Sequence, residues 1–414
     1  VENCKDNSIV TAFNKGGAGG TVTFYGANAS SVAGSVMTET GNNFSNVTVT
    51  GATTIAGWSN TEGGAPTKTI TGNTFSTIVG GTSAVTVMNV NFSGAGTLVS
   101  GNTISNISTT AVSGGSITGI SFGSSNAGAT ESFSSNSITG LSAGSLGSAT
   151  GMIGGSSSVT TMTISGNIIN TLSSTNSTGT ILGLSVTGGA TVNVTGNTIN
   201  TLAGSGTSTT VATGLSVTSG TAVNVSKNKI YDIAQSGATT NAPAVNGMLF
   251  SGGTTVTASN NLIGDLRAPA ANSTDAIRGM SITSSTTLTS YNLYYNTVFI
   301  NASSSSVNFG TTGLFHAASA TATTAKLDLR DNIIDNRSTP GATTGQTVVY
   351  RRSSGVASTL ANYASTSNNN DFFLGTAGAN KLIYADGTSA AATIAAYKSG
   401  VFTAGTVAPR DTAS

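Results

Sequence analysis

Two aspartates are spaced along the chain so that they could form a catalytic or metal-binding pair. Asp232 and Asp265 each follow, by four residues, an asparagine of a motif that returns along the chain. If successive copies of the motif stack as neighbouring strands, the two carboxylates lie about 5 Å apart. A pair that close can hold Ca²⁺, or share a proton so that the pKa of one carboxyl rises. Catalysis or metal binding is one interpretation of this pair.

The neighbouring residues favour a plainer interpretation. No third acid continues the column, which holds Thr171 and Thr201 before the pair and Ile300 and Asn336 after it. Lys229 and Arg267 lie close enough in sequence to neutralise both carboxylates. We therefore treat Asp232 and Asp265 as weak ligand candidates, and expect no metal site or cofactor.

A denser charged group follows, made of Asp328, Arg330, Asp331, Asp335 and Arg337. Enzymes that cleave polysaccharides can carry acidic and basic clusters on one outer face, so Asp328 is another weak candidate. Leucines alternate with Asp328 and Arg330, which places both charges outside. The ordinary expectation for such a group is a solvated salt-bridge patch.

Other reactive residue types are scarce. Alternation predicts Tyr291 inside and Tyr294 outside, where the ring of Tyr294 either stacks on a sugar or packs locally. His316, the only histidine, aligns with inward apolar residues, which favours a satisfied core histidine over a general base. Cys4, the only cysteine, is either a free thiol or bonded to a cysteine outside this sequence. No Ser-His-Asp triad or His/Cys metal site can be assembled from this set.

Composition narrows the class of protein. Charged residues make up 7% of the 414 residues, against roughly 25% in an ordinary domain. The formal net charge is +1, which gives no electrostatic reason to expect nucleic acid as a partner. No apolar run approaches the length of about 18 residues that would span a bilayer. The hydrophobic 37% is placed periodically, which argues against a disordered stalk.

The periodic element is a Gly-Asn-x-Ile-x-x-Leu motif that returns about every 30 residues. Its clearest copies are Gly166-Asn167-Ile168-Ile169-Asn170-Thr171-Leu172 and Gly196-Asn197-Thr198-Ile199-Asn200-Thr201-Leu202. Because the amide of asparagine both donates and accepts, stacked copies can bond to one another in a buried ladder. The predicted ladder consists of Asn73, Asn102, Asn136, Asn167, Asn197, Asn228, Asn261, Asn296 and Asn332.

Each repeat carries two or three strand-like segments and no helical pattern. The sequence therefore predicts an all-β fold, a single right-handed parallel β-helix of about ten to eleven coils. Residues 1–40 depart from the repeat and are interpreted as an entry coil or cap, and residues 41–375 as the β-helix. Residues 376–414 lose the pattern and are interpreted as a degenerate segment with a short helix near 393–398.

One outer face should be rich in hydroxyl groups. Two columns precede the ladder, and their members include Thr69/Thr71, Leu98/Ser100, Ser132/Ser134, Thr163/Ser165, Asn193/Thr195, Asn224/Ser226 and Thr257/Ser259. A flat array of this kind can order water, although Leu98 interrupts it. A solvated strand face is the ordinary expectation, and ice binding is the alternative.

Four segments of the later chain resemble a known group of proteins. They are Thr312-Gly313-Leu314-Phe315-His316, Leu327–Ile334, Val348–Ser354 and Ser367–Asn370. Together with the upstream repeats they resemble the repeat regions of large secreted surface proteins of Bacteroidota exported by the type IX secretion system. The resemblance implies an extracellular or cell-surface location, with a sorting domain that this sequence does not contain.

The sequence leaves three functions open. The leading one is a non-enzymatic structural protein, a β-helical shaft that serves as an adhesin segment or as a self-assembling filament subunit. Its partners would be further copies joined head to tail, other surface proteins or glycans, with no nucleic acid and no membrane insertion. The alternatives are a carbohydrate-binding or carbohydrate-cleaving β-helix and an ice-binding solenoid.

Overall fold

Alternating apolar and polar residues give each repeat three β strands, and the chain forms a parallel β-solenoid of about 11 turns. The structure is a computed structural model that describes residues 2–27, 32, 34–61, 66–91, 96–124, 126–207, 210–353, 359–402 and 405–414. Contacts divide the chain into two units, Val1–Gly206 and Thr207–Ser414, here called unit 1 and unit 2. The predicted all-β class, the parallel stacking and the asparagine ladder are confirmed.

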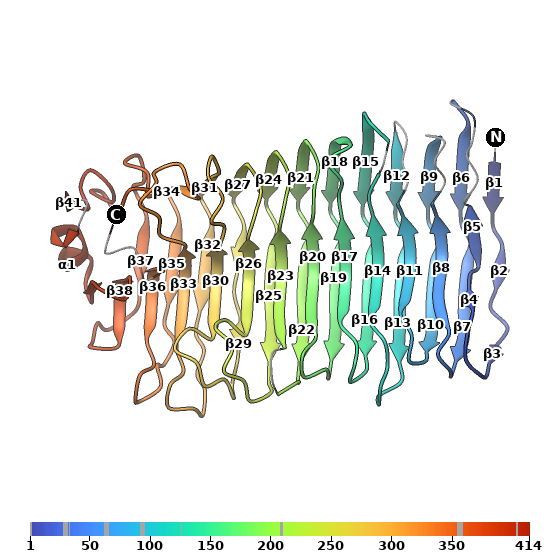
Figure 1. Ribbon diagram of the computed structural model, residues 1–414, viewed down its shortest axis with the longest axis horizontal. Coiled ribbons are helices and arrows are strands. Elements are labelled where there is room, and N and C mark those ends of the chain that lie inside the picture. The colour runs from blue at the N-terminus through green and yellow to red at the C-terminus, as the bar shows by residue number, and fades with distance from the viewer. Residues whose placement is uncertain are drawn as a thin grey trace. The chain divides into compact units, whose positions relative to one another are not determined.

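In unit 1 the strands form three parallel sheets, named A, B and C (Figure 1). Sheet A holds β1 (Glu2–Lys5), β6 (Val36–Thr40), β9 (Thr67–Thr71), β12 (Thr97–Ser100), β15 (Ala129–Ser134), β18 (Val159–Ser165) and β21 (Thr191–Thr195). Sheet B holds β2 (Ser8–Ile9), β3 (Phe13–Lys15), β7 (Asn43–Val49), β10 (Thr74–Gly80), β13 (Thr103–Thr109), β16 (Ser137–Ala143), β19 (Ile168–Ser174) and β22 (Thr198–Gly204). Sheet C holds β4 (Thr21–Val22), β5 (Tyr25–Ala27), β8 (Thr54–Asn60), β11 (Val85–Val90), β14 (Ile117–Phe122), β17 (Ala149–Gly154) and β20 (Thr180–Val186).

Unit 2 repeats this arrangement, except that the last strand of sheet C pairs antiparallel with its neighbour. Sheet A holds β24 (Ala222–Ser226), β27 (Thr255–Ser259), β31 (Ser290–Tyr294) and β34 (Lys326–Arg330). Sheet B holds β25 (Lys229–Gln235), β28 (Leu262–Ile263), β29 (Leu266–Arg267), β32 (Thr297–Ile300), β35 (Ile333–Asn336) and β37 (Asp371–Phe373). Sheet C holds β23 (Val211–Val217), β26 (Val245–Phe250), β30 (Ile277–Ile282), β33 (Thr311–His316), β36 (Thr347–Arg352), β38 (Lys381–Ala385) and β39 (Ala390–Ala391).

The ladder is continuous within each unit and has a direction. The side-chain oxygen of Asn167, for example, accepts from both the backbone N–H and the Nδ2 of Asn136, at 3.0 and 2.9 Å. The Nδ2 of Asn167 donates to the carbonyl of Phe133 and to the Oδ1 of Asn197. In unit 1 the same pattern starts at Asn7, and in unit 2 it runs from Asn228 to Asn370.

A left-handed corner precedes each ladder asparagine. Gly72, Gly101, Gly166 and Gly196 have φ between 61° and 66°, a conformation that glycine adopts without strain. Where glycine is absent, a polar residue such as Ser135 or an aromatic residue such as Tyr295 takes the same conformation. The corner is therefore set by the backbone path, and glycine is its least strained occupant.

Inward residues stack in register. In sheet B, Phe75 pairs with Ile104 and Ile78 with Ile107, and all four are fully buried. Trp58 is buried and stacks on Tyr25 at 5.5 Å between ring centroids. Because each coil covers the apolar columns of the next, the core grows with the number of coils.

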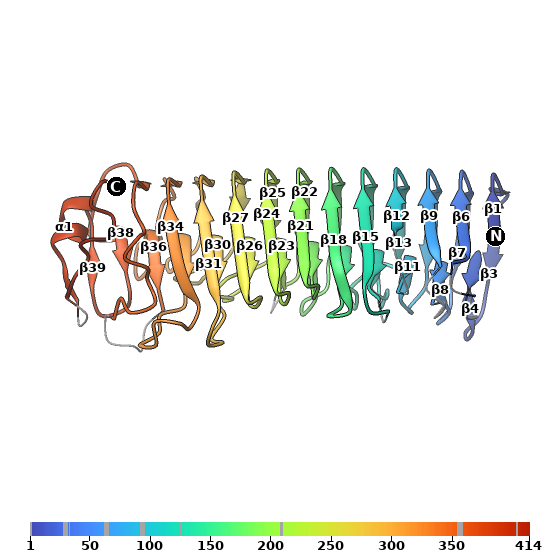
Figure 2. The ribbon, with the colours of Figure 1, turned by 90° about the horizontal axis from the view of Figure 1, so that it is seen from above.

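The two terminal regions differ. Strands β1 to β5 form a first turn that pairs with β6, β7 and β8, and Ile9, Val10 and Phe13 of this turn are exposed. In unit 2 the helix α1 (Ile394–Ser399) contacts β38 and β39 (Figure 2), with Tyr397 fully buried. A last antiparallel pair, β40 (Val401–Phe402) and β41 (Gly405–Thr406), follows the helix.

Replacing a ladder asparagine should destabilise the fold strongly. Asn167→Ala leaves the buried backbone N–H and the Nδ2 of Asn136 without their acceptor. It also leaves the backbone carbonyl of Phe133 without the donor that Asn167 supplies. We expect a loss of about 2–5 kcal/mol in the free energy of unfolding, measured by urea denaturation. Asn170→Ala, three residues away on the outer face, is the matched control and should cost roughly 0.5 kcal/mol or less. Equal losses in the two variants would contradict the structural role of the ladder.

Candidate functional site

The structure brings Asp232 and Asp265 together around one arginine. The guanidinium of Arg267 contacts Asp232 through Nη2 and Asp265 through Nε, the latter at 3.3 Å. The side chains of Asp265 and Arg267 are about half exposed, at 55% and 50%. Arg267 therefore pairs with both carboxylates and offsets one of their two negative charges.

A backbone requirement accounts for the aspartates at these positions. In the coils whose ladder residues run from Asn42 to Asn197 and in those of Asn228 and Asn261, the residue four places after the asparagine has positive φ, which is 56° at Asp232 and 47° at Asp265. In unit 1 the same bend holds Asn46, Thr77, Asn106, Gly140, Thr171 and Thr201. Aspartate, asparagine and glycine tolerate this conformation best. The column is therefore a series of bends, and its acidic members need no ligand to explain them.

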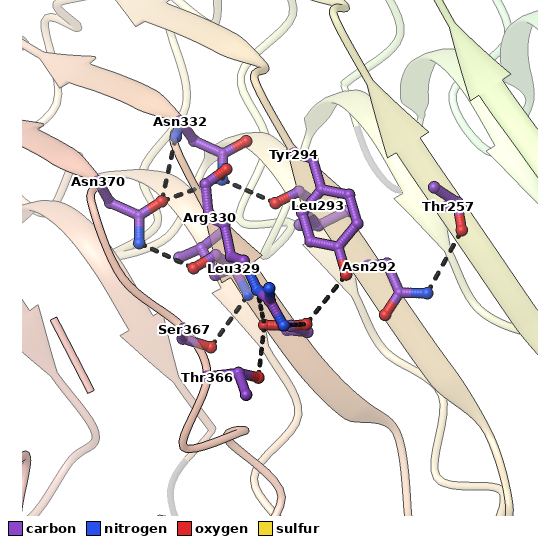
Figure 3. A network of polar contacts seen from close by, with 11 residues as sticks. Thr257, Asn292, Leu293, Tyr294, Leu329, Arg330, Asn332, Thr366, Ser367 and Asn370 are labelled. Carbon is purple, nitrogen blue, oxygen red and sulfur yellow. Dashed lines mark hydrogen bonds and ion pairs between the residues drawn. The ribbon is translucent and has the colours of Figure 1, made fainter. Parts of the chain in front are cut away.

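Asp328 and Tyr294, predicted separately, meet on the outer face of sheet A. Tyr294, Arg330 and Thr366, which surround the carboxylate, are labelled in Figure 3. Tyr294 lies on β31, and Asp328 and Arg330 lie on the paired strand β34. The Tyr294 hydroxyl donates to Asp328 Oδ2 at 2.9 Å, and Arg330 donates to both carboxylate oxygens at 2.6 and 2.9 Å. Thr366, from the segment after β36, donates to Oδ1 at 3.0 Å.

These contacts correct one expectation. Asp328 lies on the outer face as predicted, but it is only 9% exposed, because Arg330, Tyr294 and Thr366 cover it. Burial alone raises the pKa of Asp328, but the hydrogen bonds from these three residues outweigh it and leave the pKa below its usual value. Burial and the hydrogen bond to Asp328 raise the pKa of Tyr294 to about 12. Neither group exchanges a proton near neutral pH, so the cluster is suited to holding the two coils together.

His316 is fully buried in the column where the sequence placed it. Its Nδ1 lies 3.2 Å from the Tyr350 hydroxyl and its Nε2 lies 2.8 Å from the carbonyl oxygen of Ala325. Burial and the charge of Arg352 lower the pKa of His316 to about 3. A neutral, buried histidine with a polar partner at each ring nitrogen agrees with the interpretation of His316 as a satisfied core residue.

The sequence missed a second charged cluster, on the outer side of sheet C in unit 2. Arg278 forms a 2.7 Å ion pair with Asp275 and lies over the ring of Phe315, 3.5 Å from its centroid. Arg351 approaches the same carboxylate at 3.8 Å and donates to Thr312. Asp275 lies in a loop outside the repeat pattern, so no periodic signal pointed to it.

The two hydroxyl-rich columns of sheet A are in register. Leu98 pairs with Thr69 and with Ser132, and Ser100 pairs with Thr71 and Ser134. Several of these hydroxyls bond to one another along the column, as Ser134 does to Ser100 at 3.0 Å and Thr40 to Thr71 at 3.2 Å. They therefore satisfy part of their hydrogen-bonding capacity within the face.

Neither a metal centre nor a known relative defines a site. Among the residues that the structure describes, no group of three or more His, Cys, Asp or Glu side chains could hold a metal ion. In the same part of the chain, no helix has the length and apolar character needed to cross a membrane. No protein-family model, curated protein or solved structure matches the chain.

The Asp328 cluster predicts a pH-dependent contribution to stability. A carboxyl whose folded pKa is depressed stabilises the fold above its unfolded pKa of about 3.9, and this contribution is lost as pH falls through the folded pKa. Asp328→Asn should therefore lower the free energy of unfolding by about 1–3 kcal/mol at pH 7, with a smaller difference from wild type at pH 3. Urea unfolding at both pH values measures this.

Asp265→Asn is the control, because it removes an exposed carboxylate of the other acidic group. Its difference from wild type should be small at pH 7. A penalty for Asp328→Asn that stays constant between pH 7 and pH 3 would show that Asp328 contributes through shape and not through charge.

Proposed function

We propose that the chain is a non-enzymatic structural protein, a β-solenoid shaft that forms a segment of an extracellular adhesin. One observation carries the proposal: each acidic residue that the spacing selects for chemistry is held by an arginine. Asp232 and Asp265 share Arg267, and Asp328 is held by Arg330. A general acid or base needs a pKa near the working pH and access to substrate. The depressed pKa and burial of Asp328 give it neither.

The architecture suits a spacer. The ladder and the inward columns repeat with little change, so each added coil lengthens the molecule without altering its cross-section. The resemblance to repeat regions of secreted Bacteroidota surface proteins supports an extracellular location. The low charge supports a partner other than nucleic acid.

A filament subunit is the second form of the same proposal. The first turn favours it, because an exposed edge with Ile9, Val10 and Phe13 can pair with another strand layer. The last turn of unit 2 opposes it, since α1 covers β38 and β39 and Asp411 completes the ladder after Asn370. Head-to-tail growth would have to displace this cap, so we favour the shaft.

Ice binding has weaker support. The registered hydroxyl columns favour it, but Leu98 and Asn193 interrupt one column, and hydroxyls such as Ser100 and Ser134 already bond to each other. Thermal hysteresis is the direct measurement for this alternative.

The shaft proposal predicts that no polysaccharide is cleaved. The purified chain, incubated with a broad panel of neutral and acidic polysaccharides, should release no reducing ends and no unsaturated products absorbing in the ultraviolet. If wild type cleaves a polysaccharide and the Asp232→Asn/Asp265→Asn/Asp328→Asn variant does not, the chain is an enzyme and the shaft proposal is wrong.

The capped end predicts that self-assembly is limited. Sedimentation velocity across a wide range of protein concentrations should show monomers or dimers, and electron microscopy should show no fibres. Ile9→Lys/Phe13→Lys places charges on the exposed first turn and should remove any dimer that forms there. Long fibres in wild type that disappear in this variant would instead establish the filament form.

A further inference from the structure

The outer face of sheet B in unit 2 carries exposed aromatic and aliphatic side chains. The residue three places after the ladder asparagine points outward on this sheet, and in unit 1 it is Ser76, Ser105, Thr139, Asn170 or Asn200. In unit 2 the same position holds Tyr231, Gly264, Phe299, Asp335 and Phe373. We call Tyr231, Phe299 and Phe373 the aromatic row. Their exposed fractions are 40%, 40% and 42%.

A second apolar column runs beside the row. Leu262 and Ile333 lie two residues before the row position and are 48% and 47% exposed, with Thr297 between them. A soluble protein rarely exposes a contiguous apolar patch unless the patch binds something. In unit 1 the Ser, Thr and Asn at the row position show that the fold itself does not need apolar residues there.

The spacing of the row is regular. Aromatic residues occupy the row position in every second coil. In the coils between, the row position is Gly264 or Asp335. Neighbouring parallel strands are about 4.8 Å apart, so successive rings lie roughly 10 Å apart along the sheet. Gly264 adds no side chain between Tyr231 and Phe299, and both residues are 40% exposed.

Arg337 lies between the rings of Phe299 and Phe373. Its guanidinium lies 4.9 Å from the Phe373 ring centroid and 5.9 Å from that of Phe299, and it pairs with Asp335 at 2.9 Å. The guanidinium is held between two rings by a carboxylate of the same face, so Phe299, Arg337 and Phe373 form one continuous platform.

The charges around the row nearly balance. Lys229, Arg267 and Arg337 face Asp232, Asp265, Asp335 and Asp371 on the same sheet or at its bend. A face of this kind offers hydrogen-bond donors and acceptors beside apolar surface, without the positive charge that a nucleic acid needs. It suits a neutral ligand with apolar faces and many hydroxyl groups.

We propose that the aromatic row binds an extended, neutral polysaccharide with β-1,4 linkages, lying along the stacking direction of the coils. Such a chain is nearly flat, each sugar advances by about one strand spacing, and alternate sugars present the same C–H face. Rings on alternate coils stack on alternate sugars, while Thr297, Asp335 and Arg337 contact hydroxyl groups. This inference rests on the proposed function, since it supplies the ligand of an adhesin that holds glycan without cleaving it.

Retention on insoluble glycans tests the inference. The full chain is mixed with microcrystalline cellulose, with chitin and with granular starch, whose α-linkages curve the chain away from a flat face. We expect depletion from solution by cellulose or chitin and no depletion by starch. Phe299→Ala/Phe373→Ala should weaken the retention about tenfold or more, because two exposed stacking surfaces are lost.

Two variants control the comparison. Leu146→Ala/Ile168→Ala removes two exposed aliphatic side chains of unit 1 and should bind as wild type does. Phe299→Trp/Phe373→Trp keeps the stacking surfaces and should retain binding. Both aromatic sites are exposed and lie outside the core, so all variants should remain folded, which urea unfolding checks.

Each outcome decides one of the two proposals. No retention on cellulose or chitin, or equal retention by wild type and the alanine variant, overturns the aromatic-row inference and leaves the shaft intact. Retention with release of reducing ends overturns the non-enzymatic proposal and keeps the row as a glycan site. If the alanine variant loses only self-association, the row is an interface between copies and the glycan inference is wrong.

Discussion

The hydrogen bond from one ladder asparagine to the next is the interaction on which the rest of the fold depends. At the corner before sheet B, a residue with positive φ turns the backbone N–H of the asparagine out of the ordinary strand pairing. The Oδ1 of the asparagine in the next coil accepts that N–H, as Asn102 does for Asn73 at 3.0 Å. Without it, every coil would bury an unsatisfied donor at the same place.

Because the bond has a direction, the ladder needs different ends. Every asparagine donates toward the following coil, so the last one needs an acceptor that passes nothing on. Asp411 supplies it: Oδ1 accepts from Asn370, and Oδ2 accepts from the hydroxyls of Tyr363 and Tyr397. Burial raises the pKa of Asp411 above its usual value, but four side chains, including Ser414, donate to the carboxyl and oppose that shift. The polar network of the last turn is therefore a chemical terminus of the ladder, more specific than an apolar lid.

The sequence predicted what is periodic and missed what is not. The ladder, the core columns and the inward His316 follow from positions counted within one repeat, where local register leaves little choice. The predicted solvent exposure of Asp328 was wrong, because Thr366 contacts it from a segment whose length does not follow the repeat. Asp275 was missed for the same reason. The aromatic row was visible in principle, since Tyr231, Phe299 and Phe373 all stand three residues after a ladder asparagine.

Strict register also explains why function must be sought in changes of outer residue type. Inward positions are fixed by packing, corners by φ, and the ladder by hydrogen bonding, which leaves the outward columns free to vary. In unit 1 the position three residues after the ladder asparagine keeps small polar residues such as Ser76 and Ser105, which solvate the face at little entropic cost. In unit 2 the same column exposes Phe299 and Phe373. Their apolar surface contributes a favourable free energy only when another molecule removes it from water. The scaffold can place a serine there and places phenylalanine instead, and this exposed apolar surface is the observation from which the glycan site is proposed.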